Sequence, residues 1–171
     1  MPTSPGSCFL VAVCLALPAG VGRAQGGEPG KPGEPSLLQT ALSGPLKDVQ
    51  EIVFCTRLPY DDPHWYANIA YFCDDEGHKA YTGGGGRDAS ALLKLNVRSG
   101  AVATILDPQG GSVRDPQVHY DAEKILFSYR KGGTPNYLLY EINSDASGLR
   151  QLTDGPYDDI EPAYLPDGDI V

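Results

Sequence analysis

The chain has little positive charge. Its 171 residues include 13 Lys and Arg against 22 Asp and Glu, which gives a formal net charge of −9 at pH 7. No basic patch or stripe occurs along the sequence, and such patches are the usual footprint of proteins that bind nucleic acid or anionic membrane surfaces. The composition therefore argues against both kinds of partner, and a neutral or cationic partner is the easier expectation.

Long apolar runs are also scarce. The one that stands out, "FLVAVCLALPAG", lies near the N-terminus and is too short to span a bilayer. Gly22 and Ala24 follow it at the small-residue positions that precede a cleavage site, so residues 1–24 are expected to be a secretory signal. We therefore expect an exported protein, periplasmic or secreted, whose mature chain does not span a membrane.

Cysteine is nearly absent from the expected mature chain. Two of the four cysteines, Cys8 and Cys14, lie within the expected signal, which leaves Cys55 and Cys73. An even pair in an oxidising compartment favours one disulfide. The alternative is a pair of free or metal-binding thiols, although this separation is not a metal-ligand spacing and no nearby His completes a set.

Sequence motifs for catalysis and cofactor binding are missing as well. His64, His78 and His119 do not form a spaced metal motif, and the run Gly83–Gly86 fits neither common phosphate-loop pattern. No Ser-His-Asp set and no pair of catalytic carboxylates can be nominated. The sequence therefore predicts no catalytic, cofactor-binding or metal-binding residue, and it leaves open whether the protein is an enzyme.

What the sequence does contain is many turn residues and many short β-like segments. The 21 Gly and 15 Pro indicate turns rather than long helices, and no helical period is sustained over ten residues. The Gly- and Pro-rich residues 25–50 are expected to be a flexible linker. After them, the expected strands are 51–56, 91–97, 101–106, 124–129, 136–143, 149–152 and 168–171. The predicted fold class is all-β.

A repeat of 46 to 48 residues runs through this β region. The aligned positions are Asn96 with Asn143, Gly100 with Gly148, and Asp115 with Glu161. A period of this length with four strands in each copy is typical of β-propeller blades, in which each blade covers the faces of its neighbours. In the best-defined copy, the expected strands are 117–119, 124–129, 137–143 and 150–152, with a tight turn at 121–123.

The repeat resembles that of TolB-type β-propellers. The segment "LYEINSDASGLRQLTDGPYDDIEPAYLPDGDIV" has the strand, the turn, the "QLT" strand and the Pro-Asp-Gly turn of that repeat. The segments "EIVFCTRLP", "DPHWYANIAYFC" and "RDPQVHYDAEKILFSYRKGG" are also similar to exported propeller proteins that share the middle domain of hydrazine synthase α subunits. The resemblance covers about residues 51–171 and implies a TolB-like fold. It also suggests haem, which this segment cannot attach in the usual way because it has no C-x-x-C-H motif.

These observations divide the chain into three parts. They are a signal at 1–24, a linker at 25–50 and an incomplete propeller at 51–171. The propeller part holds only about two and a half blades, whereas a closed propeller has about four to eight. Its expected units are blade 1 at about 51–106, blade 2 at about 115–153 and the start of blade 3 at 161–171. We therefore expect an N-terminal fragment of a longer protein.

A long insertion in blade 1, at 57–90, supplies the first candidate for binding. Loops of this length in compact domains are usually functional or cover another part of the fold. His64, Trp65 and Tyr66 lie within it and form either a contact surface over the channel mouth or a small core of the insertion itself.

The second candidate is a set of charged residues beside the acid-Pro steps that lead into the inner strands. Because strands alternate in direction, these steps are expected on the same face as the other loops around the channel mouth. The members are Arg114, Asp115, Asp158, Asp159 and Glu161. Their carboxylates either bind a cation or a cationic partner, or accept loop N–H bonds and pair with arginines between blades.

Two functions from different classes fit these features. The first is an exported propeller scaffold that binds a protein or a small-molecule ligand, with no cofactor in this segment. The second is the N-terminal propeller part of a larger c-type-haem redox enzyme that resembles hydrazine synthase α subunits. In that case the haem belongs to sequence downstream, and C-x-x-C-H motifs there would distinguish the two functions.

Overall fold

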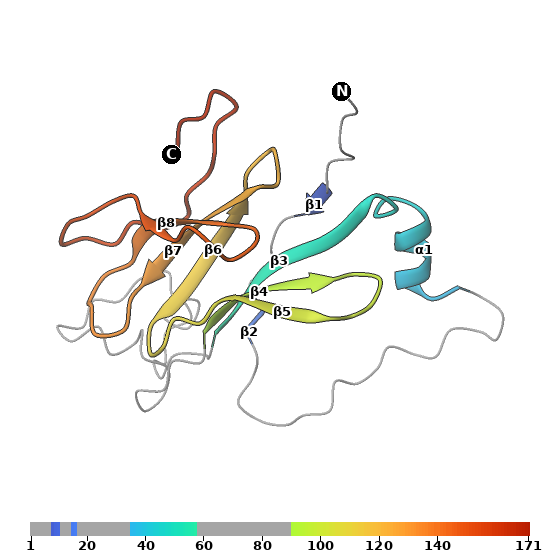
Figure 1. Cartoon of the computed structure of the whole chain (residues 1–171), viewed down its shortest axis with the longest axis horizontal. Coiled ribbons are helices and arrows are strands. Elements are labelled where there is room, and N and C mark those ends of the chain that lie inside the picture. Colours follow the sequence, from blue (N-terminus) through green and yellow to red (C-terminus); the bar gives the residue numbers. More distant parts are fainter. Residues whose placement is uncertain (1–7, 11–14, 17–34, 58–89) are drawn as a thin grey trace.

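The computed structural model describes residues 8–10, 15–16, 35–57 and 90–171, and these form two β-sheets and one short helix (Figure 1). The elements are β1 (Cys8–Leu10), β2 (Leu15–Ala16), α1 (Leu37–Ser43), β3 (Val49–Arg57), β4 (Ala91–Asn96), β5 (Val102–Leu106), β6 (Ser112–Val118), β7 (Lys124–Arg130), β8 (Leu138–Asn143) and β9 (Arg150–Gln151). In its coarse form, the all-β prediction is confirmed.

The second sheet is a four-stranded antiparallel meander in the order β6-β7-β8-β9. The first sheet has an antiparallel core of β3, β4 and β5, and β1 and β2 pair with β3 in parallel. The strands are short and rich in Val, Ile, Leu and Tyr, residue types that suit a pleated, half-buried surface. Both β1 and β2 fall within residues 1–24, the segment expected to be a signal.

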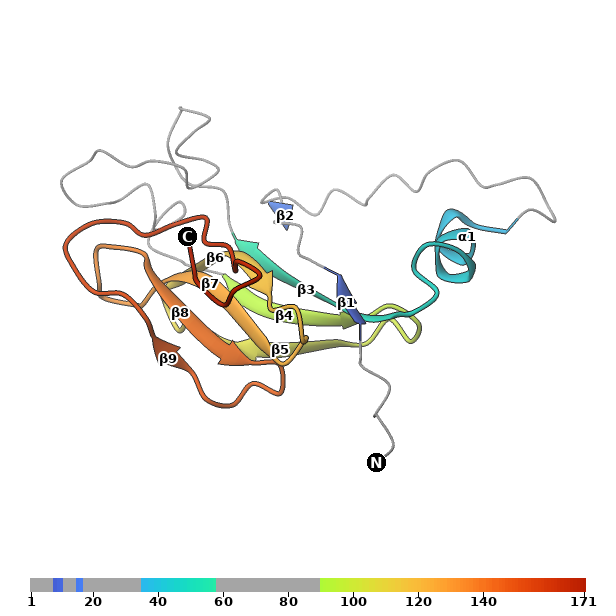
Figure 2. The ribbon, with the colours of Figure 1, turned by 90° about the horizontal axis from the view of Figure 1, so that it is seen from above.

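The two sheets pack face to face, and the main core lies between them. The first sheet contributes Val53, Cys55, Leu92 and Ile105, and the second contributes Val113, Ile125, Phe127, Tyr129, Tyr140 and Ile142. Side chains alternate between the two faces of a strand, so Val53 and Cys55 of β3, and Ile125, Phe127 and Tyr129 of β7, point into this core. Figure 2 shows α1 at the end of the first sheet that lies away from the second sheet.

Two details of the sequence analysis require correction. The first strand of the second sheet begins at Ser112 rather than at Gln117, so the Asp115–Pro116 step lies inside β6 and not in a corner before it. Pro116 has no N–H to give to the ladder, and the pairing with β7 shifts register between Arg114 and Gln117 to accommodate it. His119, expected on this strand, lies just beyond its end.

The second correction concerns the expected flexible linker. Its described part contains α1 and the first residues of β3. The helix begins with a capping box, in which the Ser36 hydroxyl accepts from Gln39 N and the Gln39 side chain accepts from Ser36 N. This reciprocal pair satisfies two backbone donors that a helix start otherwise leaves without partners.

Aligned positions of the two sequence copies have the same backbone conformation. The left-handed φ angles are 53° at Asp115 and 57° at Glu161, 63° at Ala122 and 95° at Gly168, and 72° at Gly100 and 69° at Gly148. The turns also share a hydrogen bond at aligned positions: Ala122 N donates to His119 O at 2.8 Å, and Gly168 N donates to Leu165 O at 3.0 Å. The last residues of the chain therefore follow the path of β6 and its turn a second time.

Candidate functional site

Strand alternation gathers the β5–β6 and β7–β8 connections at one end of the second sheet, together with residues 152–161. We call this the loop end. Gly111 and Gly132 place two of these connections in direct backbone contact, because a Cβ at Gly111 would overlap the carbonyl oxygen of Arg130. A Cβ at Gly132 would lie 2.8 Å from Gln109 O, closer than real Cβ atoms approach.

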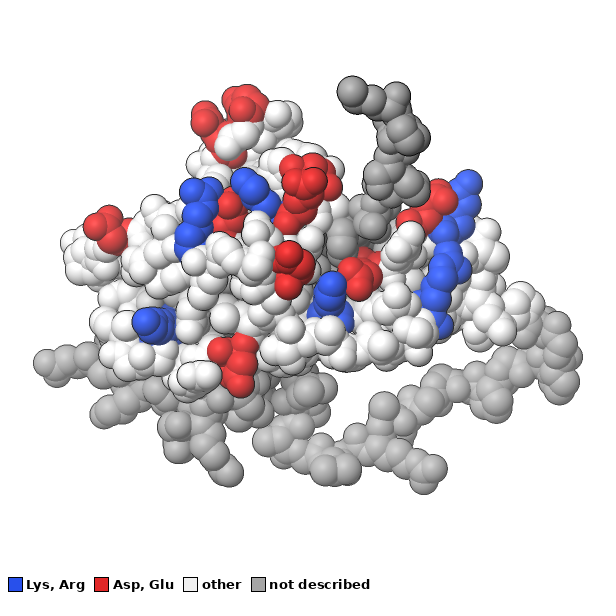
Figure 3. Space-filling model, in the orientation of Figure 1, with Lys and Arg blue, Asp and Glu red and all other residues white. Residues whose placement is uncertain are grey.

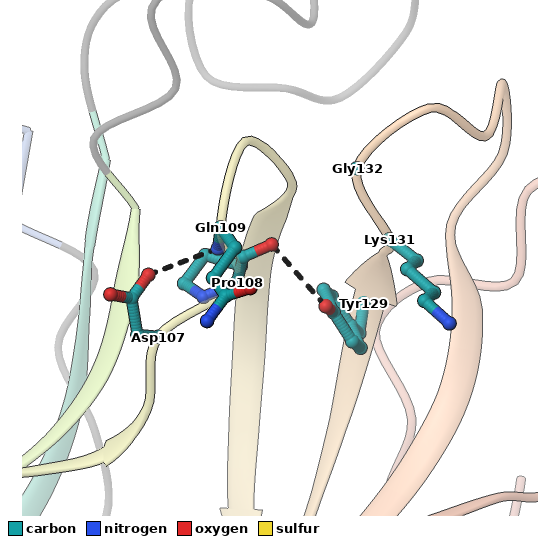
Figure 4. A pocket seen from close by; sticks show the side chains of 6 residues that line it. All are labelled: Asp107, Pro108, Gln109, Tyr129, Lys131 and Gly132. Carbon is teal, nitrogen blue, oxygen red and sulfur yellow. Dashed lines mark hydrogen bonds between the residues drawn. The ribbon is translucent and has the colours of Figure 1, made fainter.

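A cavity of about 240 Å³ lies at the loop end between these two connections (Figure 4). It is lined by Asp107, Pro108, Gln109, Tyr129, Lys131 and Gly132. Figure 4 shows Asp107 on one side of Pro108 and Tyr129, and Lys131 on the other. The cavity is therefore flanked by one acidic and one basic side chain, with a phenol hydroxyl between them.

The polar atoms of the cavity are held by contacts within the chain. The Tyr129 hydroxyl donates to Pro108 O at 3.4 Å, and Asp107 Oδ1 accepts from Gln109 N at 2.9 Å. Burial raises the pKa of Tyr129, and the neighbouring Tyr140 and Asp107 raise it further. The hydroxyl thus stays protonated at neutral pH; it donates its proton to Pro108 O and can accept a hydrogen bond, but it is not a nucleophile.

Three of the five charged residues predicted at the channel mouth meet in one cluster. The buried Arg114 guanidinium pairs with the Asp115 carboxylate through Nε, and its Nη2 lies 3.5 Å from Glu161 Oε1. Asp115 Oδ2 also accepts from Glu161 N at 3.2 Å. These contacts fit the interpretation in which the carboxylates accept loop N–H bonds and pair with an arginine, because Asp115 binds both Arg114 and the backbone of Glu161.

The other two predicted residues lie nearby and fix the loop that follows the second sheet. Asp158 Oδ1 accepts from Tyr137 N at 2.8 Å and from Asn136 Nδ2 at 3.4 Å. Asp159 N donates to Tyr137 O at 2.8 Å. Asp158 therefore ties residues 152–161 to the start of β8, and the five predicted residues are divided between two separate sets of contacts.

Several predicted residues lie outside the described part of the chain. These are His64, Trp65, Tyr66, His78 and Cys73. Cys55 is fully buried in the core between the sheets. The Cys55–Cys73 disulfide and the contact surface on the insertion therefore stay predictions.

A second polar cluster, which the sequence analysis missed, lies at the opposite end of the second sheet. The side chain of Glu141, only 8% exposed, accepts from Arg150 Nε at 3.0 Å and from the Tyr164 hydroxyl at 3.0 Å. Lys124 Nζ lies 3.6 Å from the same carboxylate, and the Tyr164 ring meets the His119 ring edge to face at 4.7 Å. The available signal was an acid inside the otherwise apolar strand segment "YLLYEI".

The environment of Glu141 keeps its carboxylate charged. Burial alone raises the pKa of Glu141, but the hydrogen bonds from Tyr164 and Arg150 lower it by more, so the pKa lies below its ordinary value. Burial, reinforced by the bond to Glu141, raises the pKa of Tyr164 far above its usual range. The pair therefore holds one negative charge and one neutral phenol across neutral pH.

The described residues contain neither a candidate metal centre nor a helix that could span a membrane. Among the described residues, no group of three or more His, Cys, Asp and Glu side chains is placed to hold a metal ion. In the same ranges, no helix is both long enough and apolar enough to cross a bilayer. Figure 3 shows Lys and Arg side chains singly or in small groups beside Asp and Glu, rather than in one basic patch.

Comparisons with known proteins point to hydrazine synthase. No family model matches the chain. Over 149 residues it is 30% identical to hydrazine synthase subunit alpha of Kuenenia stuttgartiensis, which is 82% of this chain and 16% of that protein. A solved structure of Kuenenia stuttgartiensis hydrazine synthase matches with a TM-score of 0.50 and 17% identity, over 71% of this chain and 16% of the other. The chain thus spans about a sixth of the length of each; the sequence likeness supports a relation to the α subunit, and the structural likeness supports the fold alone.

Proposed function

We propose that the chain is part of an exported β-propeller that serves as a binding scaffold, and that its loop end is the binding face. Support for stacked blades comes from the four-stranded meander, from its face-to-face packing on the first sheet, and from the turns that recur at the aligned positions. Propellers and related scaffolds usually bind their partners through loops at one end of the blades.

The observation that carries the binding role is the cavity between the β5–β6 and β7–β8 connections. At about 240 Å³ it is below the usual size of drug-like pockets and suits a small polar molecule. Its walls offer a carboxylate, an ammonium, a phenol hydroxyl and backbone carbonyls, but no activated nucleophile with a partner base. Binding without covalent chemistry is what this set of groups can do.

The test is a ligand-observed NMR screen of small polar metabolites against the whole chain, followed by the same screen on two lysine variants. Lys131→Ala removes one wall of the cavity, and Lys47→Ala removes an exposed lysine beside α1. A ligand of the loop end should lose at least tenfold in affinity with the first variant and be unchanged with the second. A screen without hits, or hits that respond equally to both variants, would refute the binding role.

A second function is favoured by one specific observation, the 30% identity to hydrazine synthase subunit alpha over most of this chain. In this alternative the chain is the N-terminal propeller part of a larger c-type-haem redox enzyme. Its own residues then act as a scaffold, since they include no C-x-x-C-H motif. Sequencing the flanks of the gene tests this directly: C-x-x-C-H codons downstream favour it, and further β-repeats alone argue against it.

Export and the Cys55–Cys73 disulfide belong to the same proposal. Cleavage after Ala24 is expected to place the mature chain in an oxidising compartment, where a buried Cys55 forms a bridge to the insertion. Mass spectrometry of the secreted protein, alkylated before and after reduction, measures both features. Two alkylated thiols without reduction, or an uncleaved N-terminus, would contradict them.

A further inference from the structure

We propose that the cavity at the loop end binds a small zwitterion, a molecule with an ammonium group and a carboxylate group at the two ends of a short apolar body. The inference rests on the proposed binding role of the loop end, and it names the class of ligand. Asp107 forms the negative wall of the cavity and Lys131 the positive wall, and Pro108 and Tyr129 lie between them (Figure 4). A zwitterion complements all three parts of this arrangement.

Both charges of the cavity are accessible to a ligand. Asp107 and Lys131 are exposed residues, and in the part of the chain that the structure describes neither takes part in an ion pair. Asp107 Oδ1 accepts from Gln109 N at 2.9 Å, but a carboxylate has further acceptor positions. The Lys131 ammonium offers three donors. Each wall therefore presents a charged group that a ligand group of opposite charge can reach.

The region between the two charges suits an apolar body with an ammonium at one end. Pro108 is buried and has no polar side-chain atom, and the Tyr129 side chain offers its ring and one hydroxyl. That hydroxyl donates to Pro108 O at 3.4 Å, so toward a ligand it acts as an acceptor. Asp107 lies close enough to raise the pKa of the same hydroxyl. A ligand therefore meets acceptors on the Asp107 side, which suits the N–H groups of an ammonium, and meets two rings beside them.

The separation of the two charges is fixed at the backbone and adjustable at one side chain. The close contacts at Gly111 and Gly132 hold the β5–β6 and β7–β8 connections together. Lys131 O accepts from Thr134 N at 3.0 Å and from Thr134 Oγ1 at 2.7 Å, which fixes the backbone that carries the positive wall. The Lys131 side chain itself has a flexible four-carbon stem. We therefore expect the presence of both ligand charges to matter more than the exact distance between them.

The size of the cavity limits the ligand to a few atoms. Its volume of about 240 Å³ corresponds to roughly eight water molecules at about 30 Å³ each, so a molecule of roughly eight non-hydrogen atoms fills it. Short α-amino acids and ω-amino acids have this size and carry both charges. Peptides and nucleotides are too large to be enclosed.

Three probes of nearly equal size test the inference on the whole chain without any substitution. They are γ-aminobutyrate, which has both charges, γ-hydroxybutyrate, which lacks the ammonium, and aminobutanol, which lacks the carboxylate. Saturation-transfer NMR measures the dissociation constant of each probe. One exposed charge pair changes an equilibrium constant by up to about fivefold, so we expect γ-aminobutyrate to bind about fivefold more tightly than either of the other two.

Two matched pairs of variants assign the ligand charges to the two walls. Asp107→Asn keeps an oxygen for the loop N–H and removes only the charge, and Asp167→Asn makes the same change at an Asp turn outside the cavity. Lys131→Gln is compared with Lys47→Gln, at an exposed lysine beside α1. Asp107→Asn should weaken γ-aminobutyrate about fivefold and leave γ-hydroxybutyrate within about twofold. Lys131→Gln should weaken γ-aminobutyrate equally and leave aminobutanol unchanged, and the two controls should change neither.

Other outcomes would overturn the proposal. Equal affinities of the three probes, or no measurable binding of γ-aminobutyrate, would contradict a zwitterion as the ligand. Equal effects of the cavity variants and their controls would place the binding elsewhere. A metabolite that carries no ammonium, but loses affinity with Lys131→Ala and not with Lys47→Ala, would support the binding role and contradict the zwitterion. Failure of the ligand class and failure of the binding role are therefore distinguishable.

Discussion

Replacing Tyr164 by Phe should destabilise the chain by about 1.5 kcal/mol at pH 7, because a hydrogen bond to a charged acceptor contributes about 1.5–3 kcal/mol net. The variant loses only the hydroxyl that donates to Glu141 at 3.0 Å, and it keeps the ring that packs on His119. We take the lower end of the range because Arg150 still compensates the Glu141 charge. Such a loss corresponds to about a tenfold change in the folding equilibrium.

The loss should depend on pH with a definite sign. The pKa of Glu141 is lowered in the folded state, so its charged form contributes stability above the unfolded pKa of about 4.3 and loses it as the pH falls through the folded pKa. Removing the Tyr164 hydroxyl raises the folded pKa of Glu141 toward the unfolded value. The difference between the variant and the natural chain should therefore be largest near pH 7 and should shrink below about pH 4.

The assay is urea unfolding of the whole chain followed by circular dichroism, at pH 7 and well below pH 4. Tyr120→Phe is the matched control, since its exposed hydroxyl donates to a backbone carbonyl, Tyr164 O, at 3.1 Å; we expect a loss below about 0.5 kcal/mol. Glu141→Gln in both backgrounds completes a double-mutant cycle. Equal stability of Tyr164→Phe and the natural chain at pH 7, or strictly additive losses in the cycle, would refute the assigned interaction.

Three further substitutions test the fold and the loop end by the same unfolding measurement. Gly111→Ala should lower the free energy of unfolding by more than about 2 kcal/mol, because the new Cβ overlaps the backbone of Arg130. Gly110→Ala has open space and should lower it by only about 1–2 kcal/mol, because of the left-handed φ. Equal losses would contradict the close backbone contact at Gly111. Phe127→Ala should lower the free energy of unfolding by about 3–5 kcal/mol, whereas Tyr120→Ala, at an exposed position, should lower it by less than about 1 kcal/mol. A small loss for Phe127→Ala would place Phe127 outside the core. Asp115→Asn should cost about 2 kcal/mol because it removes the charge beside the buried Arg114, and a neutral result would argue against the cluster.

Strand positions were the part of the fold that the sequence could predict. Alternating or continuous apolar segments mark β3, β4, β7 and β8 to within two residues, because burial on one or both faces leaves that pattern in the chain. The start of β6 was missed because an acid followed by Pro usually marks a turn, and only the register shift within the ladder lets the strand run through it. The helix at 37–43 was missed because Gly and Pro dominate the residues before it, although Ser36 and Gln39 have capping-box spacing.

Contacts at the two ends of the second sheet were predictable to different degrees. The repeat alignment placed Asp115 and Glu161 at equivalent positions, and strand alternation placed both near the loop end with Arg114. The Glu141–Tyr164 pair depends instead on how the last segment lies across the sheet, and nothing in the spacing of the two residues encodes that. Local patterns thus predicted the strands and which loops lie at the same end of the sheet. Long-range packing decided which polar groups are in contact.

The bond from Asp115 to Glu161 N also has a meaning for how such a chain lengthens. The two residues occupy aligned positions 46 residues apart, and Asp115 supplies the acceptor while Glu161 supplies the backbone donor. In a chain whose copies all repeat this bond, each copy supplies one acceptor for the copy that follows and one donor to the copy before it. A gene duplication that inserts a whole copy would therefore bring a donor for the copy before it and an acceptor for the copy after it. The number of units can change during evolution without a new junction having to arise by point mutation.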